Sequence, residues 1–127
     1  MRFMLRSFMA SILLLLSSGV ALSDTTTFEC TYAKYSDEAG SHAEKKPFRL
    51  TFLVDSSAEQ AYLIGNNGSS KVELVGNPGG FTFVEITGTG NVMVTAITKS
   101  GESVHSRTGI MGDVIIPAQY YGRCTIK

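Results

Sequence analysis

The chain has 127 residues, with 11 Lys and Arg balanced by 11 Asp and Glu, so its formal net charge is zero. A balanced charge without a basic stripe argues against a nucleic acid as partner. The two histidines and two cysteines are too few for a multi-ligand metal centre. We therefore expect no metal and no cofactor.

The N-terminal segment has the three parts of a secretory signal. Arg2 and Arg6 supply positive charge, an apolar run covers residues 8–16, and Ala21 and Ser23 form a small-x-small cleavage site. A membrane span needs about 20 apolar residues, so this run is too short for the alternative, an uncleaved anchor. The pattern predicts that the segment is removed during export.

We therefore predict a signal peptide over residues 1–23 and a single domain over residues 24–127. The protein is then periplasmic or secreted, with no membrane span after cleavage. An exported protein meets an oxidising compartment, where an even pair of cysteines usually forms a disulfide. We expect a bond between Cys30 and Cys124, near the two ends of the domain. Free thiols, or a bond to a partner, are the alternative.

The sequence of the domain predicts short strands separated by turn residues. The clearest alternation of apolar and polar residues runs from Phe48 to Val54. Asn67-Gly68 is typical of a hairpin turn, and Pro117 is expected to end a short strand. A polar loop is expected over residues 36–47. The expected strands are 27–32, 48–54, 60–64, 71–75, 81–87, 92–98, 103–110, 114–116 and 122–127.

About eight short strands, without a stretch of helical period, predict an all-β fold: a small antiparallel up-and-down β-barrel or a two-sheet sandwich. A bond between Cys30 and Cys124 would place the first and last strands side by side. This favours a closed barrel, because closure removes exposed strand edges. A barrel of this size is either filled by its own side chains or holds one small ligand, and the pattern leaves both open.

A hypothetical binding face involves the last two predicted strands. His105 and Arg107 are two residues apart, so on a strand they share one face. If the terminal strand lies beside them, Tyr120, Tyr121 and Arg123 complete the face. An arginine fork suits a carboxylate or a phosphate. The alternative is a polar sheet surface that faces solvent.

Asp37, Glu38, His42 and Glu44 bring oxygen and nitrogen donors into the expected polar loop. Such groups can bind a divalent cation, but their spacing matches no known metal-binding pattern. A solvated loop is therefore the preferred interpretation.

The sequence gives little support for a catalytic site. His105 and Ser106 are adjacent, so on a strand they point to opposite faces, and no Gly-x-Ser-x-Gly elbow surrounds Ser106. Glu85 shares the face of Phe81 and Phe83, yet we expect it to reach solvent, directly or through a bulge. The alternative is a buried carboxylate with a raised pKa. We expect no enzyme activity.

Residues 105–110 and 119–124, together with 65–68 and 86–90, resemble segments of small uncharacterised exported bacterial proteins. This resemblance implies no particular activity. In layout, Phe28-Glu29-Cys30 and the late Cys124 also resemble the periplasmic inhibitors of c-type lysozyme, which are small exported β-barrels. The Ser-Gly-x-x-Tyr motif that enters the lysozyme cleft in that family is missing here, so no functional residue is carried over.

These observations predict an exported, non-catalytic binding protein whose partner is another protein or a small anionic ligand. A periplasmic inhibitor of a lysozyme-like enzyme is the first alternative. A small-ligand carrier or a hydrolase is the second, the latter held back by the lack of a nucleophile–base pair.

Overall fold

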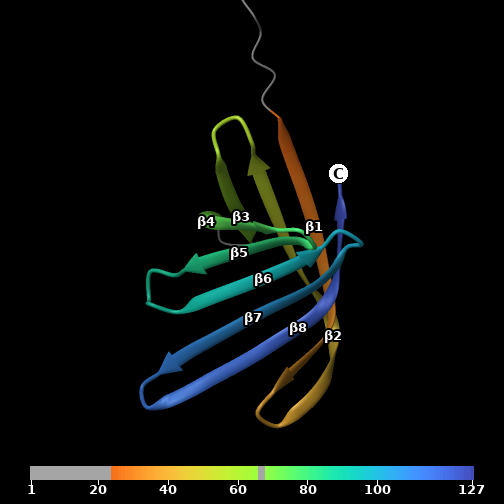
Figure 1. Cartoon of the computed structure of the whole chain (residues 1–127). Helices are drawn as coiled ribbons and strands as arrows, with labels where there is room; N and C mark the ends of the chain where they lie inside the picture. Colours follow the sequence, from red (N-terminus) through yellow and green to blue (C-terminus); the bar gives the residue numbers. More distant parts are fainter. Residues whose placement is uncertain (1–23, 66–67) are drawn as a thin grey trace, which may run out of the picture.

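A computed structural model describes residues 24–65 and 68–127, which fold into a closed antiparallel barrel (Figure 1). Each strand pairs with its neighbour in the chain, and β8 pairs with β1. Of the two predicted architectures, the barrel is confirmed. The predicted signal peptide lies outside the described residues. The strands are β1 (Thr25–Asp37), β2 (Gly40–Asp55), β3 (Gln60–Gly65), β4 (Gly68–Asn77), β5 (Gly80–Ile86), β6 (Val92–Thr98), β7 (Glu102–Met111) and β8 (Val114–Ile126).

The core lies inside the barrel, because alternate residues of each strand point inward. Aromatic rings fill much of it. Phe52 and Phe83 stack with ring centroids 4.3 Å apart, and Phe28 meets Phe83 edge-on at 6.2 Å. The buried apolar residues are Phe28, Cys30, Tyr32, Leu50, Phe52, Ala61, Leu63, Val72, Phe83, Ile97, Tyr120 and Cys124.

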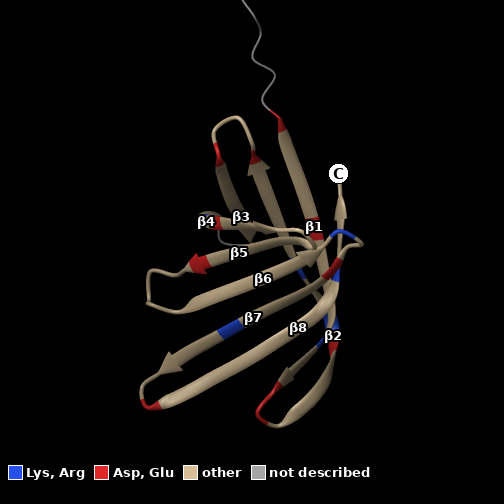
Figure 2. Cartoon of the chain, in the orientation of Figure 1, with Lys and Arg blue, Asp and Glu red and all other residues tan. Residues whose placement is uncertain are grey.

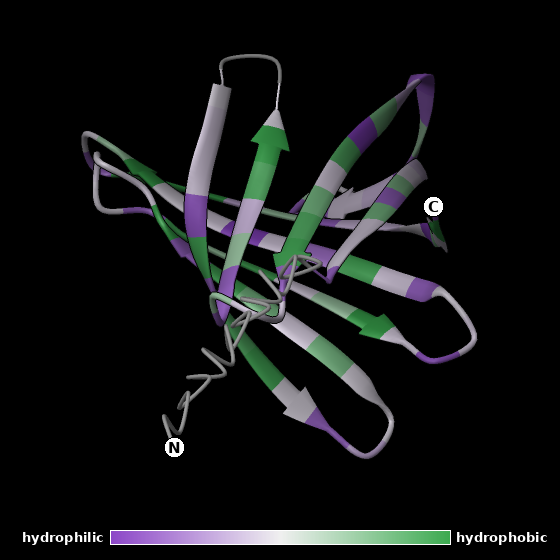
Figure 3. Cartoon of the chain, turned by 90° about the horizontal axis from the view of Figure 1, so that it is seen from above, coloured by the Kyte–Doolittle hydropathy of each residue, from purple (hydrophilic) through white to green (hydrophobic). Residues whose placement is uncertain are grey.

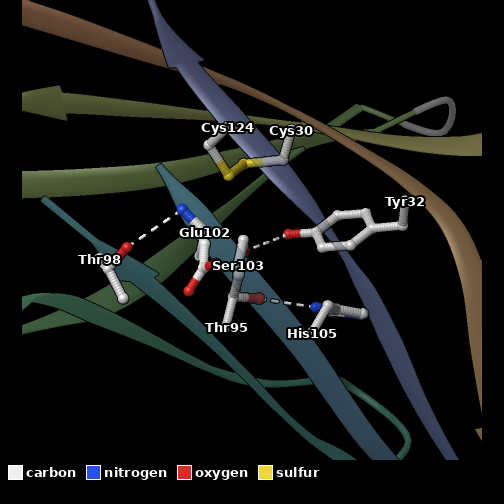
Figure 4. Close-up of a disulfide and its surroundings, with 8 residues drawn as sticks. All are labelled: Cys30, Tyr32, Thr95, Thr98, Glu102, Ser103, His105 and Cys124. Carbon is white, nitrogen blue, oxygen red and sulfur yellow. Dashed lines mark hydrogen bonds between the residues drawn. A yellow bond between two sulfur atoms is a disulfide. The ribbon is translucent and has the colours of Figure 1, made fainter. Parts of the chain in front are cut away.

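A disulfide joins the first and last strands, as predicted. Cys30 and Cys124 lie directly opposite each other in the ladder between β1 and β8. Both side chains point into the core, where they are 1% and 7% exposed (Figure 4). The bond spans a sequence separation of 94 residues, so it fastens almost the whole domain into one loop.

Next to the disulfide, β1 and β8 approach each other closely. Gly122 lies opposite Tyr32, where β1 changes register between Tyr32 and Lys34. A Cβ atom at position 122 would come within 2.0 Å of the Thr31 carbonyl oxygen. A glycine is therefore required here, because any side chain would force the two strands apart at the bulge.

The polar loop predicted over residues 36–47 is wrong. β1 continues to Asp37, β2 begins at Gly40, and the two strands pair across a two-residue turn. Strand pairing uses backbone groups, so a hairpin whose side chains are largely exposed can form without a continuous apolar face. Polarity alone was therefore a poor signal for a loop in this segment.

The strand end predicted at Pro117 is also wrong, since β8 runs through this residue. β1 pairs with β8 only as far as Gln119. The Lys127 N–H donates to the Thr27 carbonyl of β1 at 3.0 Å. Backbone nitrogens an even number of residues apart in a strand face the same side, so the nitrogen of Pro117 also faces the β1 side of β8. It lies beyond the last residue of β8 that pairs with β1. The missing N–H of proline therefore removes no ladder hydrogen bond.

Removal of the disulfide should destabilise the fold strongly. We expect Cys30→Ala combined with Cys124→Ala to lower the free energy of unfolding by about 4–5 kcal/mol, because cross-linking a loop near 100 residues restricts the unfolded chain by about that amount. Chemical denaturation monitored by circular dichroism measures the change. Reduction of the unmodified protein should reproduce it, and a loss below about 1 kcal/mol would contradict the stapling role.

Candidate functional site

The five predicted binding residues divide between the two faces of β7 and β8. His105 lies opposite Tyr120 in the ladder, and Arg107 follows on the same inward face. Tyr121 and Arg123 occupy the alternate, outward face of β8. The structure thus brings three of the five residues together at one end of the barrel, and it separates the other two from them.

Arg107 lies at the barrel mouth against two aromatic rings. Its guanidinium carbon is 4.8 Å from the ring centroid of Tyr120 and 5.7 Å from that of Phe48. The guanidinium also donates a hydrogen bond to the Tyr120 hydroxyl. No salt bridge within residues 24–65 and 68–127 includes Arg107. The site therefore holds an arginine that is positioned by aromatic contacts and has no acidic partner in the described part of the chain.

A pocket of about 380 Å³ opens beside this arginine. Tyr35, Met93, Ala118 and Tyr120 contribute to its wall, and Asp37 and Glu38 also line it. The apolar wall accommodates an uncharged body, and the guanidinium offers a fork of donors that suits an oxyanion. The two carboxylates on the border would oppose a second negative charge.

A stack of aromatic rings supports this mouth. Tyr35 stacks on His42 at 4.8 Å and on Tyr120 at 5.6 Å, measured between ring centroids. His42 Nε2 donates to the Asp37 carboxylate at 2.8 Å, and this bond, helped by the Ala39 N–H, lowers the pKa of Asp37. The ring that supports Arg107 is therefore held in place by a further layer of contacts.

The four polar residues weighed as cation ligands do not converge. Asp37 and His42 bond to each other, while Glu38 and Glu44 do not join them. Within the part of the chain that the structure describes, no cluster of three or more His, Cys, Asp or Glu side chains is arranged for a metal ion.

His105 lies beneath the mouth and is only 1% exposed. Its Nδ1 is hydrogen bonded to Thr95 Oγ1 at 2.6 Å (Figure 4), while Nε2 is buried without a partner among the described residues. Burial, aided by the positive charge of Arg107, lowers the pKa of His105 to about 4. The imidazole is therefore neutral at neutral pH, and for this residue the alternative of a solvent-facing sheet surface is excluded.

A second buried polar contact lies deeper in the barrel. The Tyr32 hydroxyl is 2.8 Å from Ser103 Oγ (Figure 4), and burial raises the pKa of Tyr32 to about 12. The interior beside the disulfide is therefore partly polar, with its hydroxyl groups paired.

Glu85 points into the barrel, which corrects the expectation that it reaches solvent. The residue is 9% exposed, and its Oε2 atom is buried without a partner among the described residues. Glu85 lies opposite Met93, and Met93 lies opposite Arg107. The carboxylate and the guanidinium therefore share one level of the interior, two strands apart. Alternation with Phe83 indicated this orientation, but the usual exposure of carboxylates outweighed it.

Tyr121 and Arg123 border a different hollow, of about 540 Å³, on the outer surface of the barrel. The Arg123 guanidinium donates to the Ser100 carbonyl at 2.8 Å. This arginine therefore supports the turn between β6 and β7, whereas Arg107 is directed toward an open pocket.

The fold and site together define a closed, disulfide-linked eight-stranded barrel with an arginine at one mouth. No protein-family model, curated protein or solved structure matches the chain. Across residues 24–65 and 68–127 there is no helix with the length and apolar character to cross a membrane. Any functional proposal therefore depends on the geometry of this chain.

Stability should fall when the pH is lowered from 6.5 to about 4. In this range the unfolded chain binds a proton on His105 that the folded protein excludes, so protonation favours unfolding by up to roughly 3 kcal/mol. Urea denaturation at a series of pH values measures the slope. We expect His105→Gln to flatten this slope, and an unchanged slope in His105→Gln would contradict the assignment.

Replacing Glu85 should stabilise the barrel. Glu85→Leu removes a buried carboxylate oxygen that has no partner within residues 24–65 and 68–127, so we expect the free energy of unfolding to rise by about 1–3 kcal/mol. Glu73→Leu, an exposed change on the neighbouring β4, serves as the control and should have little effect. Thermal and chemical denaturation give the comparison, and a destabilised Glu85→Leu protein would show that the carboxylate is paired in solution.

Proposed function

We propose that this protein is an exported, non-catalytic binding module whose barrel mouth binds an anionic group. The observation that carries the proposal is Arg107, a cation held against the Tyr120 and Phe48 rings at an open pocket, with no acidic partner among the residues that the structure describes. Export is supported by the signal-like segment at residues 1–23 and by the disulfide, which is typical of oxidising compartments.

A carboxylate attached to an apolar body fits this mouth best. The planar guanidinium pairs with carboxylates through two parallel hydrogen bonds, and the apolar part of the wall includes Met93 and Ala118. The volume of about 380 Å³ lies within the range common for small-molecule sites. Asp37 and Glu38 at the border disfavour groups with several negative charges, such as phosphate, relative to a single carboxylate.

Binding is favoured over catalysis by the state of the nearest reactive side chains. His105 is buried and neutral, and Ser106 points to the opposite face of β7. A general base must reach the proton it removes, directly or through one water molecule. The arrangement supports recognition of an anion, while the anion itself can belong to a small molecule or to a side chain of another protein.

The proposal predicts that an aromatic carboxylate binds at the mouth. In a titration with sodium benzoate followed by NMR, the amide signals of Arg107, Tyr120 and Tyr35 should shift, with a dissociation constant of about 1 mM or tighter, as is ordinary for so small a ligand. Benzylamine, which has the same ring and the opposite charge, should leave these signals unmoved.

A matched pair of variants tests whether Arg107 is responsible. Arg107→Gln should weaken benzoate binding by at least about tenfold, because it removes the charged fork. Lys71→Gln makes the same change of charge on β4, away from the mouth, and should bind like the unmodified protein. Equal weakening in both variants, or benzoate shifts located elsewhere on the barrel, would overturn the proposed site.

A further inference from the structure

The hairpin of β7 and β8 continues beyond the rest of the barrel. β6 pairs with β7 only as far as Thr108, and β1 pairs with β8 only as far as Gln119. The residues between these limits pair only with each other, and Figure 1 shows this end of the hairpin diverging from that of β1 and β2. We call residues 109–118 the hairpin tip.

The hairpin tip is unusually apolar for a solvent-exposed segment (Figure 3). Exposed apolar patches in soluble proteins commonly mark interaction surfaces, and the exposure here is high on both sides of the hairpin. The side chains concerned are Ile110 (69% exposed), Met111 (70%), Val114 (61%), Ile115 (63%) and Ile116 (45%).

Two features restrict what can cover the hairpin tip. Asp113, in the turn, is its only charged residue, so charge is sparse there (Figure 2). The nitrogen of Pro117 faces the free edge of β8, where it can donate no hydrogen bond to an added strand. A partner is therefore expected to contact side chains, and it should offer an apolar surface with positive charge nearby.

The outer surface of the same chain has such a region. The hollow of about 540 Å³ has a mostly apolar lining that includes Ala96, Val104 and Tyr121. Lys34 and Arg123 border it, with Glu102 as the single acidic residue among those that line it. We call this region the outer hollow. Its apolar lining and surplus of positive charge complement the hairpin tip and Asp113.

We propose that the hairpin tip binds the outer hollow of a second copy of this chain. Ile110 and Ile115 lie opposite each other on the outward face of the hairpin, the face that Val104 and Tyr121 also occupy. Along β7 and β8, Ile110 and Ile115 are eight residues from Glu102 and Arg123, which border the outer hollow, or roughly 25 Å. Two copies packed with these strands antiparallel bring each tip to the other copy's hollow.

This arrangement has twofold symmetry, with the axis passing near Ser106 and Gln119, which lie opposite each other midway between the two regions. The same contact forms twice, so association closes at a dimer and does not propagate into a filament. Ile116 and Ala118 of the hairpin tip also line the mouth pocket, but the outward residues Ile110 and Ile115 do not. Changes at Ile110 and Ile115 therefore test the dimer without altering the lining of the mouth site.

Sedimentation velocity of the mature protein over a wide concentration range tests the proposal. We expect a monomer–dimer equilibrium. Ile110→Ser combined with Ile115→Ser should raise the dimer dissociation constant at least about tenfold, because two central apolar contacts are lost. A protein that stays monomeric at every concentration would overturn the proposal, as would a tip variant that dimerises like the original.

A charge swap distinguishes the specific dimer from nonspecific apolar association. Asp113→Lys alone and Arg123→Glu alone should each weaken the dimer at low salt by about tenfold, and the two changes in one chain should restore it to within a few-fold of the original. Asp113 is exposed in a turn, so this variant remains informative if the serine variant fails to fold. Absence of restoration would overturn the proposed pairing of tip and hollow.

Discussion

The contact between β1 and β8 is the constraint on which the rest of this structure depends. It turns a row of consecutive hairpins into a closed barrel, and a buried disulfide between Cys30 and Cys124 holds it covalently. Gly122 allows the two strands to approach at the bulge of β1. Closure gives every strand an inside and an outside, and so it fixes which side chains of β7 and β8 enter the core.

The two faces of β7 and β8 then acquire different chemistry. The inward face carries a buried, neutral His105 and, at the mouth, Arg107 against a stack of aromatic rings. The outward face carries the apolar hairpin tip and the hollow bordered by Arg123. One pair of strands therefore carries both the proposed anion site and the proposed surface for self-association. Ile110 and Ile115 can be altered without changing the lining of the anion site.

Much of the fold was predictable, since cysteine pairing, strand alternation and turn residues are local or compositional signals. Which tyrosine faces His105 was not predictable, because alternation relates residues within a strand but does not set the register between strands. His105 lies opposite Tyr120, and not opposite Tyr121, because the turn between β7 and β8 has two residues. Glu85 was predicted to reach solvent because carboxylates are usually exposed, although its position in the strand indicated burial. The likeness to lysozyme inhibitors stays a prediction.

The most direct test of this account is a nuclear Overhauser spectrum of the oxidised protein. The account predicts cross-strand peaks between backbone protons of Cys30 and Cys124, whose Cα atoms are 3.9 Å apart, and between those of Tyr32 and Gly122. Amide protons in this ladder should also exchange slowly with solvent. Missing peaks with fast exchange along β1 and β8 would show an open sheet and would contradict the inward placement of His105 and Arg107.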